Sequence, residues 1–183
     1  MLEARILHIC TANRCRSVIA ERLARAMVPE SIVNSSAGID AQAGEGIWPA
    51  AARELERRGV PVLGFAATEL TLPMLRSADL VLAATRGQRD AVSAMEPSVF
   101  RRTFTWRELA WLLGGVSRAE VAGEWPAERL RALPALANSR RGLLLAPQGK
   151  DLDVEDPVGR SGRATAKAAG VIEASLKVLA GLV

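Results

Sequence analysis

The sequence contains no tyrosine, one histidine and only two cysteines. Cys10 and Cys15 lie too close together to frame a secreted disulfide scaffold, and no second Cys or His pair accompanies them to form a zinc site. No apolar run approaches the roughly 20 residues that span a bilayer, and the N-terminus lacks the pattern of a signal peptide. We therefore expect a cytoplasmic protein without a membrane association and without a bound metal.

Charge is almost balanced: 24 basic residues face 20 acidic ones, for a formal net charge of +4. The basic residues are scattered and form no Lys/Arg block, and no aromatic-rich binding motif accompanies them. This distribution argues against a nucleic-acid partner and accommodates a small anionic substrate. With 183 residues, 49% of them hydrophobic, the chain is long enough to bury a core. We expect one domain over residues 1–183, and the oligomeric state stays open.

Short apolar runs alternate with stretches that carry apolar residues at helical spacing. Strands are expected over residues 5–9, 31–36, 78–83 and 99–105. Helices are expected over residues 17–27, 48–58, 86–95, 108–113, 126–140 and 163–182, with Pro134 interrupting the fifth. The alternation predicts an α/β fold, a four-stranded parallel sheet with helices on both faces. We expect the strand order 2-1-3-4. Ligands bind such sheets at the carboxyl ends of the strands, which indicates the loop after the first strand.

That loop runs from Cys10 to Ser17. Its backbone N–H groups can converge on a phosphate, and the helix that follows adds positive partial charge at its N-terminus. The same field favours the thiolate form of Cys10, and Ser17 can donate a hydrogen bond to its sulfur. Arg16 offers a planar fork of donors to two phosphoryl oxygens, and Asn13 tolerates the left-handed conformation of a tight loop. The loop predicts phosphate monoester hydrolysis through a cysteine nucleophile, with no cofactor.

Each of these residues has an ordinary structural role when taken alone. A lone buried Cys is usually an inert small hydrophobe, an isolated Arg a solvated surface group, and a Ser before a helix a cap. Their joint spacing between a strand and a helix favours the chemical interpretation. His8, the only histidine, lies inside an apolar strand and is expected to be a packed core residue and not a catalytic base.

The segment ILHICTANRCRSVIAE resembles the low-molecular-weight protein tyrosine phosphatase family, whose bacterial members carry CTGNxCRSPxAE after the first strand. The similarity continues through Ser36-Ala37-Gly38, through SADLVLA at 77–83 and to Asp156-Pro157. The resemblance implies that Cys10 attacks phosphorus while Arg16 and the loop hold the phosphoryl oxygens. It also implies that Asp156 protonates the leaving oxygen and then activates water. Taken alone, Asp-Pro is more typical of a loop turn than of a catalytic acid.

The resemblance extends to residues around the nucleophile. It implies that the substrate phosphate contacts Thr11, Ala12, Asn13, Arg14, Cys15 and Ser17. Ser36 resembles a support for Asn13, and Cys15 matches a cysteine that can form a reversible disulfide with Cys10, unless it is only a small packing residue. Trp48 is either one wall of the substrate cleft or a packing residue at a helix start. Arg14 either faces the cleft or lies in solvent, and it argues against a protein-arginine phosphatase, where Thr stands at this position.

Three departures from the family pattern are visible. Val18 replaces the usual Pro after the serine, Ala12 replaces a Gly, and Val158 stands where an aromatic residue commonly follows Asp-Pro. In addition, a segment around residues 114–150 is longer than in compact members. It forms a lid, a substrate-selecting flap or only extra surface.

The predicted partner is a tyrosine-phosphorylated protein, and three alternatives stay open. The first is a small phosphorylated metabolite. The second is arsenate reduction coupled to a small thiol, because no cysteine follows Cys15 to complete a protein disulfide relay. The third is a phosphate-binding module without turnover, suggested by Val18 and Val158.

Overall fold

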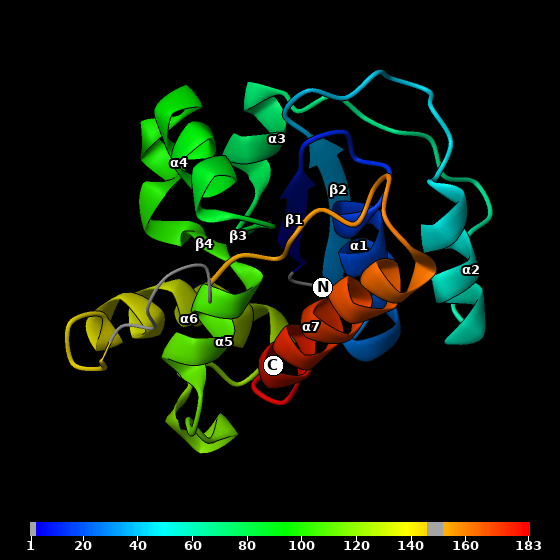
Figure 1. Ribbon diagram of the computed structural model, residues 1–183. Helices are drawn as coiled ribbons and strands as arrows, with labels where there is room; N and C mark the ends of the chain where they lie inside the picture. Colours follow the sequence, from blue (N-terminus) through cyan, green and yellow to red (C-terminus); the bar gives the residue numbers. More distant parts are fainter. Residues whose placement is uncertain (1–2, 146–151) are drawn as a thin grey trace.

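The computed structural model describes residues 3–145 and 152–183. Its four strands form one sheet in the order β2-β1-β3-β4, and every pair of neighbours is parallel (Figure 1). The strands are β1 (Ala4–Cys10), β2 (Ile32–Gly38), β3 (Leu80–Ala83) and β4 (Thr103–Thr105). The predicted number, direction and order of the strands are confirmed.

Helices connect and cover the strands. They are α1 (Arg16–Met27), α2 (Pro49–Arg57), α3 (Leu72–Ser77), α4 (Arg86–Met95), α5 (Trp106–Leu113), α6 (Pro126–Arg140) and α7 (Gly162–Ala180), with 3-10 turns η1 (Pro97–Arg102) and η2 (Arg118–Glu120). Within the residues that the model describes, no helix is long and apolar enough to cross a membrane.

Three expectations about these elements were wrong. The sequence reading missed α3 entirely. The strand expected over 99–105 begins only at Thr103, because Pro97 starts the turn η1 and the Glu96 side chain caps it by accepting from the backbone N–H of Ser98. Pro134 does not interrupt α6, which continues through it to Arg140, and the proline is buried together with Leu130.

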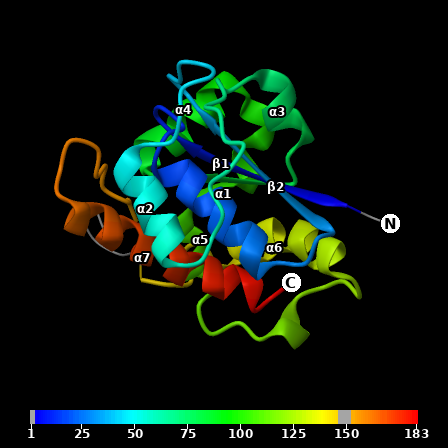
Figure 2. The ribbon, with the colours of Figure 1, turned by 90° about the vertical axis from the view of Figure 1, so that its right-hand side faces the viewer.

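The alternation of side chains along β1 divides the core between two faces of the sheet. Ile6 and Cys10 point to the larger core, which α1, α5 and α7 cover, while Leu7 and Ile9 point to a smaller core under α3 and α4. Figure 2 shows α7 lying against α1 on the first of these faces. Helices therefore cover both faces, as the alternation predicted.

His8 is fully buried, as expected for a core residue. Its Nε2 lies 3.0 Å from Asn34 Oδ1, and its Nδ1 accepts from the indole N–H of Trp106 at 3.1 Å. Because Nδ1 is an acceptor, the ring proton sits on Nε2 and is donated to Asn34. Burial lowers the pKa of His8 to about 4, so the ring is neutral at physiological pH.

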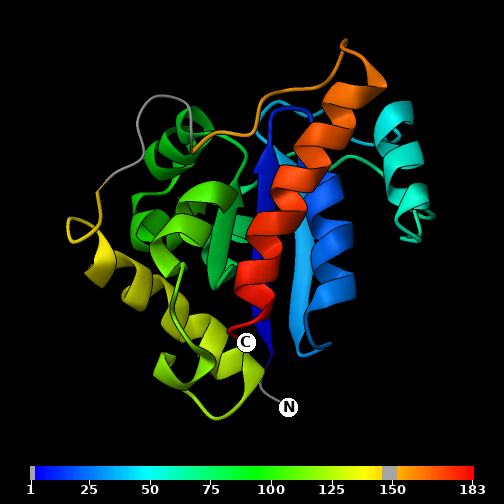
Figure 3. The same cartoon turned by 60° about the horizontal axis from the view of Figure 1, so that its bottom comes forward.

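The helix α6 lies at the amino end of the sheet, away from the loop after β1 (Figure 3). Arg131 bonds Asp79, just before β3, at 3.1 Å and also the backbone oxygen of Glu3, just before β1. Asn138 donates to the carbonyl of Arg101 before β4 at 2.6 Å. Of the three roles considered for the longer segment, a lid and a flap over Cys10 are therefore wrong for α6. Residues 146–150 of that segment lie outside the described residues.

Candidate active site

Cys10 is the last residue of β1, and α1 begins six residues later at Arg16, so the loop between them opens at the carboxyl end of the sheet. Cys10 is 2% exposed, and its Sγ lies 3.0 Å from Ser17 Oγ. Strands β2 and β3 lie on opposite sides of β1, so the chain connections on either side of β1 run in opposite directions across the sheet. The predicted loop thus occupies the switch in strand order where α/β proteins bind ligands.

Asn13 holds the loop from inside. It is fully buried and is the one non-glycine residue with a positive φ in the described chain, at 54°. Its Nδ2 donates to Ser17 Oγ and to Ser36 Oγ, each at 2.9 Å, and its Oδ1 accepts from the backbone N–H of Thr68 at 2.8 Å. Every hydrogen-bonding atom of this amide is used, which stabilises the left-handed turn that Asn tolerates better than most residues with a Cβ.

The direction of these hydrogen bonds determines whether the Ser17 hydroxyl can donate to the Cys10 sulfur. The Ser36 hydroxyl donates to the buried carboxylate of Glu21, so it accepts from Asn13. Ser17 likewise accepts from Asn13 and has one proton left. Among the described residues, the Cys10 sulfur is the remaining partner of Ser17, so Ser17 is placed to donate that proton to the sulfur.

Neighbouring elements fix the outside of the loop. Thr11 Oγ1 accepts from Gln88 Nε2 of α4 at 2.9 Å, and the backbone N–H groups of Ile39 and Asp40 bind the carbonyls of Cys10 and Thr11 at 3.1 and 3.0 Å. A Cβ on Gly38 would lie only 2.4 Å from the carbonyl oxygen of Thr11, so this contact requires glycine. The loop is consequently clamped between β2 and α4.

Arg16 has one donor without a partner. Its Nη1 donates to the Val154 carbonyl at 3.1 Å and its Nη2 to Asp156 Oδ2 at 2.6 Å. Its Nε is buried and has no hydrogen-bond partner among the described residues. A buried unpaired N–H is costly, and a phosphoryl oxygen in the loop would satisfy it. Arg16 therefore indicates where an anion binds.

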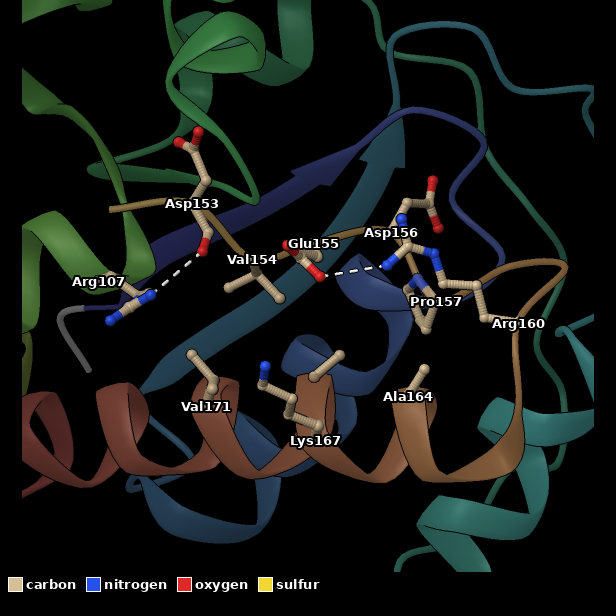
Figure 4. A pocket seen from close by; sticks show the side chains of 11 residues that line it. Arg107, Asp153, Val154, Glu155, Asp156, Pro157, Arg160, Ala164, Lys167 and Val171 are labelled. Carbon is tan, nitrogen blue, oxygen red and sulfur yellow. Dashed lines mark hydrogen bonds and ion pairs between the residues drawn. The ribbon is translucent and has the colours of Figure 1, made fainter. Parts of the chain in front are cut away.

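Asp156 reaches Arg16 from the other end of the chain on a segment that is anchored by its backbone. Val154 N–H donates to the carbonyl of Ala84 at 2.7 Å, and Thr105 Oγ1 donates to the carbonyl of Leu152 at 2.6 Å. Asp156 itself stays half exposed, with Oδ1 accepting from the N–H of Val158 at 3.1 Å. Figure 4 shows its carboxylate turned away from α7.

Cys15 is buried beside the loop, 3% exposed, and like Cys10 it is a free cysteine. Burial, followed by the nearby Cys10 and Asp156, raises the pKa of Cys15 to about 12, although Arg16 acts in the opposite direction. Cys15 is therefore a neutral thiol at physiological pH and is no competitor to Cys10 as nucleophile.

Arg14 and Trp48 form one rim of the loop. Arg14 donates to the carbonyl of Gly46 at 2.8 Å and pairs with Glu45 at 3.0 Å, and its guanidinium lies 5.9 Å from the ring centroid of Trp48. The backbone N–H of half-buried Trp48 donates to the carbonyl of Arg14 at 2.8 Å. Arg14 is thus held by the segment before α2 and is not idle in solvent.

Comparison with known proteins identifies the family. Residues 5–109 match the model of the low molecular weight phosphotyrosine protein phosphatases. The chain is 36% identical over 98 residues to the probable low molecular weight protein-tyrosine-phosphatase AmsI of Erwinia amylovora, covering 54% of this chain and 67% of that one. It is 36% identical over 107 residues to the low molecular weight protein-tyrosine-phosphatase Etp of Escherichia coli K12, covering 58% and 70%.

The chain belongs to the low molecular weight phosphotyrosine protein phosphatase family. Among solved structures, it matches the fold of the YwlE arginine phosphatase from Geobacillus stearothermophilus with a TM-score of 0.71 and 24% identity, over 97% of this chain and 90% of that one. The family consists of cysteine-dependent phosphatases, which agrees with the chemistry that the loop predicted.

Sequence reasoning about this phosphatase missed four residues that hold the loop: Glu21, Gly38, Thr68 and Gln88. Glu21 and Gly38 lay inside segments that were matched, but their partners were not evident. Gln88 stands at the third position of a capping box that starts at Thr85, a pattern readable from the sequence. Its second bond, to Thr11, joins residues 77 positions apart and left no sequence signal.

Proposed function

We propose that this phosphatase hydrolyses phosphate monoesters through a cysteinyl-phosphate intermediate, with tyrosine-phosphorylated proteins as its substrates. The observation that carries the proposal is the arrangement around Arg16. One guanidinium lies in the loop of Cys10, binds the carboxylate of Asp156, and keeps a buried Nε without a partner. Nucleophile, anion-binding group and acid are thereby brought together from both ends of the chain.

Substrate binding follows from the donors of Arg16. Nε and Nη2 form one edge of the guanidinium, the geometry that takes two oxygens of a phosphoryl group. Nε is unpaired, and Nη2 becomes available when the phosphoryl group displaces Asp156. Nη1 stays on the carbonyl of Val154. Binding of the substrate therefore also releases Asp156 to reach the leaving group.

The chemistry then needs two steps. In the first, the Cys10 thiolate attacks phosphorus in line, the bond to the ester oxygen breaks, and protonated Asp156 gives its proton to that oxygen. In the second, the Asp156 carboxylate takes a proton from water, which attacks the cysteinyl phosphate and expels the thiolate with inorganic phosphate as product. Ser17 stabilises the sulfur as nucleophile and as leaving group through its remaining proton. All these groups belong to the chain itself.

A phosphotyrosine substrate is supported by the names of AmsI and Etp as protein-tyrosine-phosphatases and by the rim of the loop. Trp48 supplies an aromatic side chain beside Arg14, which is suited to stack on a phenyl ring. Val158, 43% exposed, gives a smaller opposite wall than an aromatic residue. A small metabolite, arsenate reduction and binding without turnover are the alternatives against which this proposal is tested.

The test compares kcat/KM for a phosphotyrosine peptide, a phosphoserine peptide, a phosphoarginine peptide and a sugar phosphate. We expect the phosphotyrosine peptide to be hydrolysed fastest. Trp48→Leu should lower its kcat/KM by about tenfold, the equivalent of one lost aromatic contact of about 1.4 kcal/mol. Trp125→Leu is the matched control, because Trp125 is 59% exposed and precedes α6 at the other end of the sheet. A preference for the sugar phosphate would overturn the proposed substrate.

Three predictions from the sequence are retained here as proposals. They are a single domain over residues 1–183, a reversible disulfide between Cys10 and Cys15, and a cytoplasmic location. Their support is the common core under α1, α5 and α7 for the first and the shared burial of both thiols at one loop for the second.

A further inference from the structure

A second cavity lies behind the segment that carries Asp156. It has a volume of about 240 Å³ and opens between the segment Asp153–Pro157 and α7 (Figure 4). We name it the α7 cavity. Its apolar lining includes Val154, Ala164, Ala168 and Val171. No residue of the Cys10–Ser17 loop lines it, whereas Asp156 and Pro157 do.

The carboxylates around the α7 cavity are already neutralised. Asp153 accepts from the backbone N–H and the Nε of Arg86, Glu155 pairs with Arg160 at 3.2 Å, and Asp156 pairs with Arg16. None of these three carboxylates is left to compensate a further positive charge. Any other cationic side chain in the lining therefore has a positive charge that these carboxylates do not balance.

Two such cations line the α7 cavity. Arg107 makes one long hydrogen bond, from Nη1 to the carbonyl of Asp153 at 3.4 Å, and within the described residues no carboxylate pairs with it. Lys167 has no hydrogen bond or ion pair with any described residue, and Figure 4 shows its side chain rising from α7 into the cavity. Two uncompensated cations above an apolar floor are the surroundings that an organic anion requires.

We propose that the α7 cavity is a second anion site, which binds a small organic phosphate or phosphonate with a compact apolar body, its charge held by Arg107 and Lys167. The volume of the cavity limits the size of the apolar part of the ligand. The volume is below the roughly 300–1,000 Å³ of pockets for drug-sized ligands, which suits a ligand with a single ring.

The ligand of the α7 cavity is an effector and not the substrate, because neither Cys10 nor Arg16 lines this cavity. Val154 and Asp156 both line it, but the carboxylate of Asp156 turns away from α7 and pairs with Arg16 (Figure 4). Arg107 binds the backbone of that segment at Asp153. An anion on Arg107 and Lys167 ties the segment to α7 and changes how readily Asp156 leaves Arg16. This effect on turnover rests on the function proposed above, whereas the binding itself does not.

The test uses phenylphosphonate, which has one ring and a phosphonate that cannot be hydrolysed as an ester. It is titrated into the ¹⁵N-labelled protein while backbone amide shifts are followed for residues 11–16 of the loop and for residues 164–171 of α7. We expect two groups of shifts with different midpoints. Arg107→Gln combined with Lys167→Gln should raise the dissociation constant of the α7 group at least tenfold and leave the loop group unchanged.

Arg163→Gln is the matched control, because it removes one positive charge from the same helix outside the lining and should leave both groups intact. The proposal is overturned if the wild-type α7 amides do not shift. It is also overturned if the shifts of the α7 amides have the same midpoint as those of the loop amides and persist in the double variant. Those shifts would then report binding at Cys10. If only the α7 group shifts, the second site stands and the proposed phosphate site at the loop fails.

Discussion

The Cys10–Ser17 loop and the segment from Leu152 to Val158 meet at one ion pair, but they are held in opposite ways. Cys10, Asn13, Cys15, Arg16 and Ser17 of the loop are buried. The side chains of Thr11, Asn13 and Ser17 are all hydrogen-bonded to partners in the protein. The segment is anchored through its backbone, and its functional carboxylate is 50% exposed, against 5% for the side chain of Arg16. In the mechanism proposed above, the groups that bind and attack phosphate are therefore preorganised, while the acid moves when substrate arrives.

Among variants that keep the nucleophile, the largest effect should come from the segment that carries Asp156. Asp156→Asn removes the proton donor, so kcat/KM for phenyl phosphate, whose leaving group needs the proton, should fall by about 10²–10⁴-fold. For p-nitrophenyl phosphate the loss should be much smaller, because nitrophenolate leaves without protonation. Binding of inorganic phosphate should not weaken, since the variant no longer pairs a charged carboxylate with Arg16.

Glu155→Gln is a suitable control for Asp156→Asn, because Glu155 is the neighbouring carboxylate and pairs only with exposed Arg160. It should leave both substrates within a few-fold of wild type. Equal losses on the two substrates in Asp156→Asn would assign the acid role to another group.

A second effect concerns the stability of the strand that carries the loop. The pKa of His8 is lowered to about 4 by burial, with a smaller contribution from Arg25 and an opposing one from the Asn34 hydrogen bond, whereas an exposed histidine titrates near 6.5. Between these values the unfolded chain binds a proton that the folded protein does not. The stability that His8 contributes is therefore complete above pH 6.5 and falls with pH, by about 3 kcal/mol at pH 4.

Urea denaturation of the wild type and of His8→Gln at pH 7.5, 6 and 5 measures this contribution. Gln does not titrate, so the free energy of unfolding of the wild type should fall more steeply below pH 6.5 than that of the variant. Parallel curves for the two proteins would show that His8 is not the group responsible.

The smallest of these effects concerns Asn13 in the Cys10–Ser17 loop. It separates the contribution of the Asn13 hydrogen bonds from that of its left-handed backbone conformation. Asn13→Ala removes its hydrogen bonds and places a Cβ without them at a φ of 54°, and should cost about 1–3 kcal/mol of stability. Asn13→Gly loses the same hydrogen bonds, but glycine has no Cβ and adopts the left-handed conformation without strain. The Gly variant should therefore be more stable than the Ala variant by about 1 kcal/mol. Equal stabilities would mean that the left-handed turn is not strained.

What the sequence could predict was mainly local. Cys10, Arg16 and Ser17 lie within eight residues, and a strand before them and a helix after them determine how they meet. The strand order was also predicted correctly. By contrast, η1 replaced four residues of an expected strand because Pro97 and the Glu96 cap outweighed the apolar pattern, and α3 is too short to display a helical period.

Apart from the support of Asn13 by Ser36, which the resemblance implied, contacts between distant segments were beyond such reasoning. The pairing of Arg16 with Asp156 across 140 positions, and the resulting free Nε, follow from tertiary packing alone. The place of α6 is a similar case, since nothing in its amphipathic pattern says which end of the sheet it covers. Arg131 and Asn138 decide it by binding backbone carbonyls before β1 and β4.

The most direct test of a preorganised Cys10 nucleophile is hydrolysis of p-nitrophenyl phosphate in EDTA by the wild type, Cys10→Ser and Cys15→Ser. We predict turnover by the wild type, no measurable turnover by folded Cys10→Ser, and retained activity in Cys15→Ser, because Cys15 is a neutral buried thiol. Undiminished turnover by Cys10→Ser, or a folded and reduced wild type that hydrolyses nothing, would contradict the mechanism.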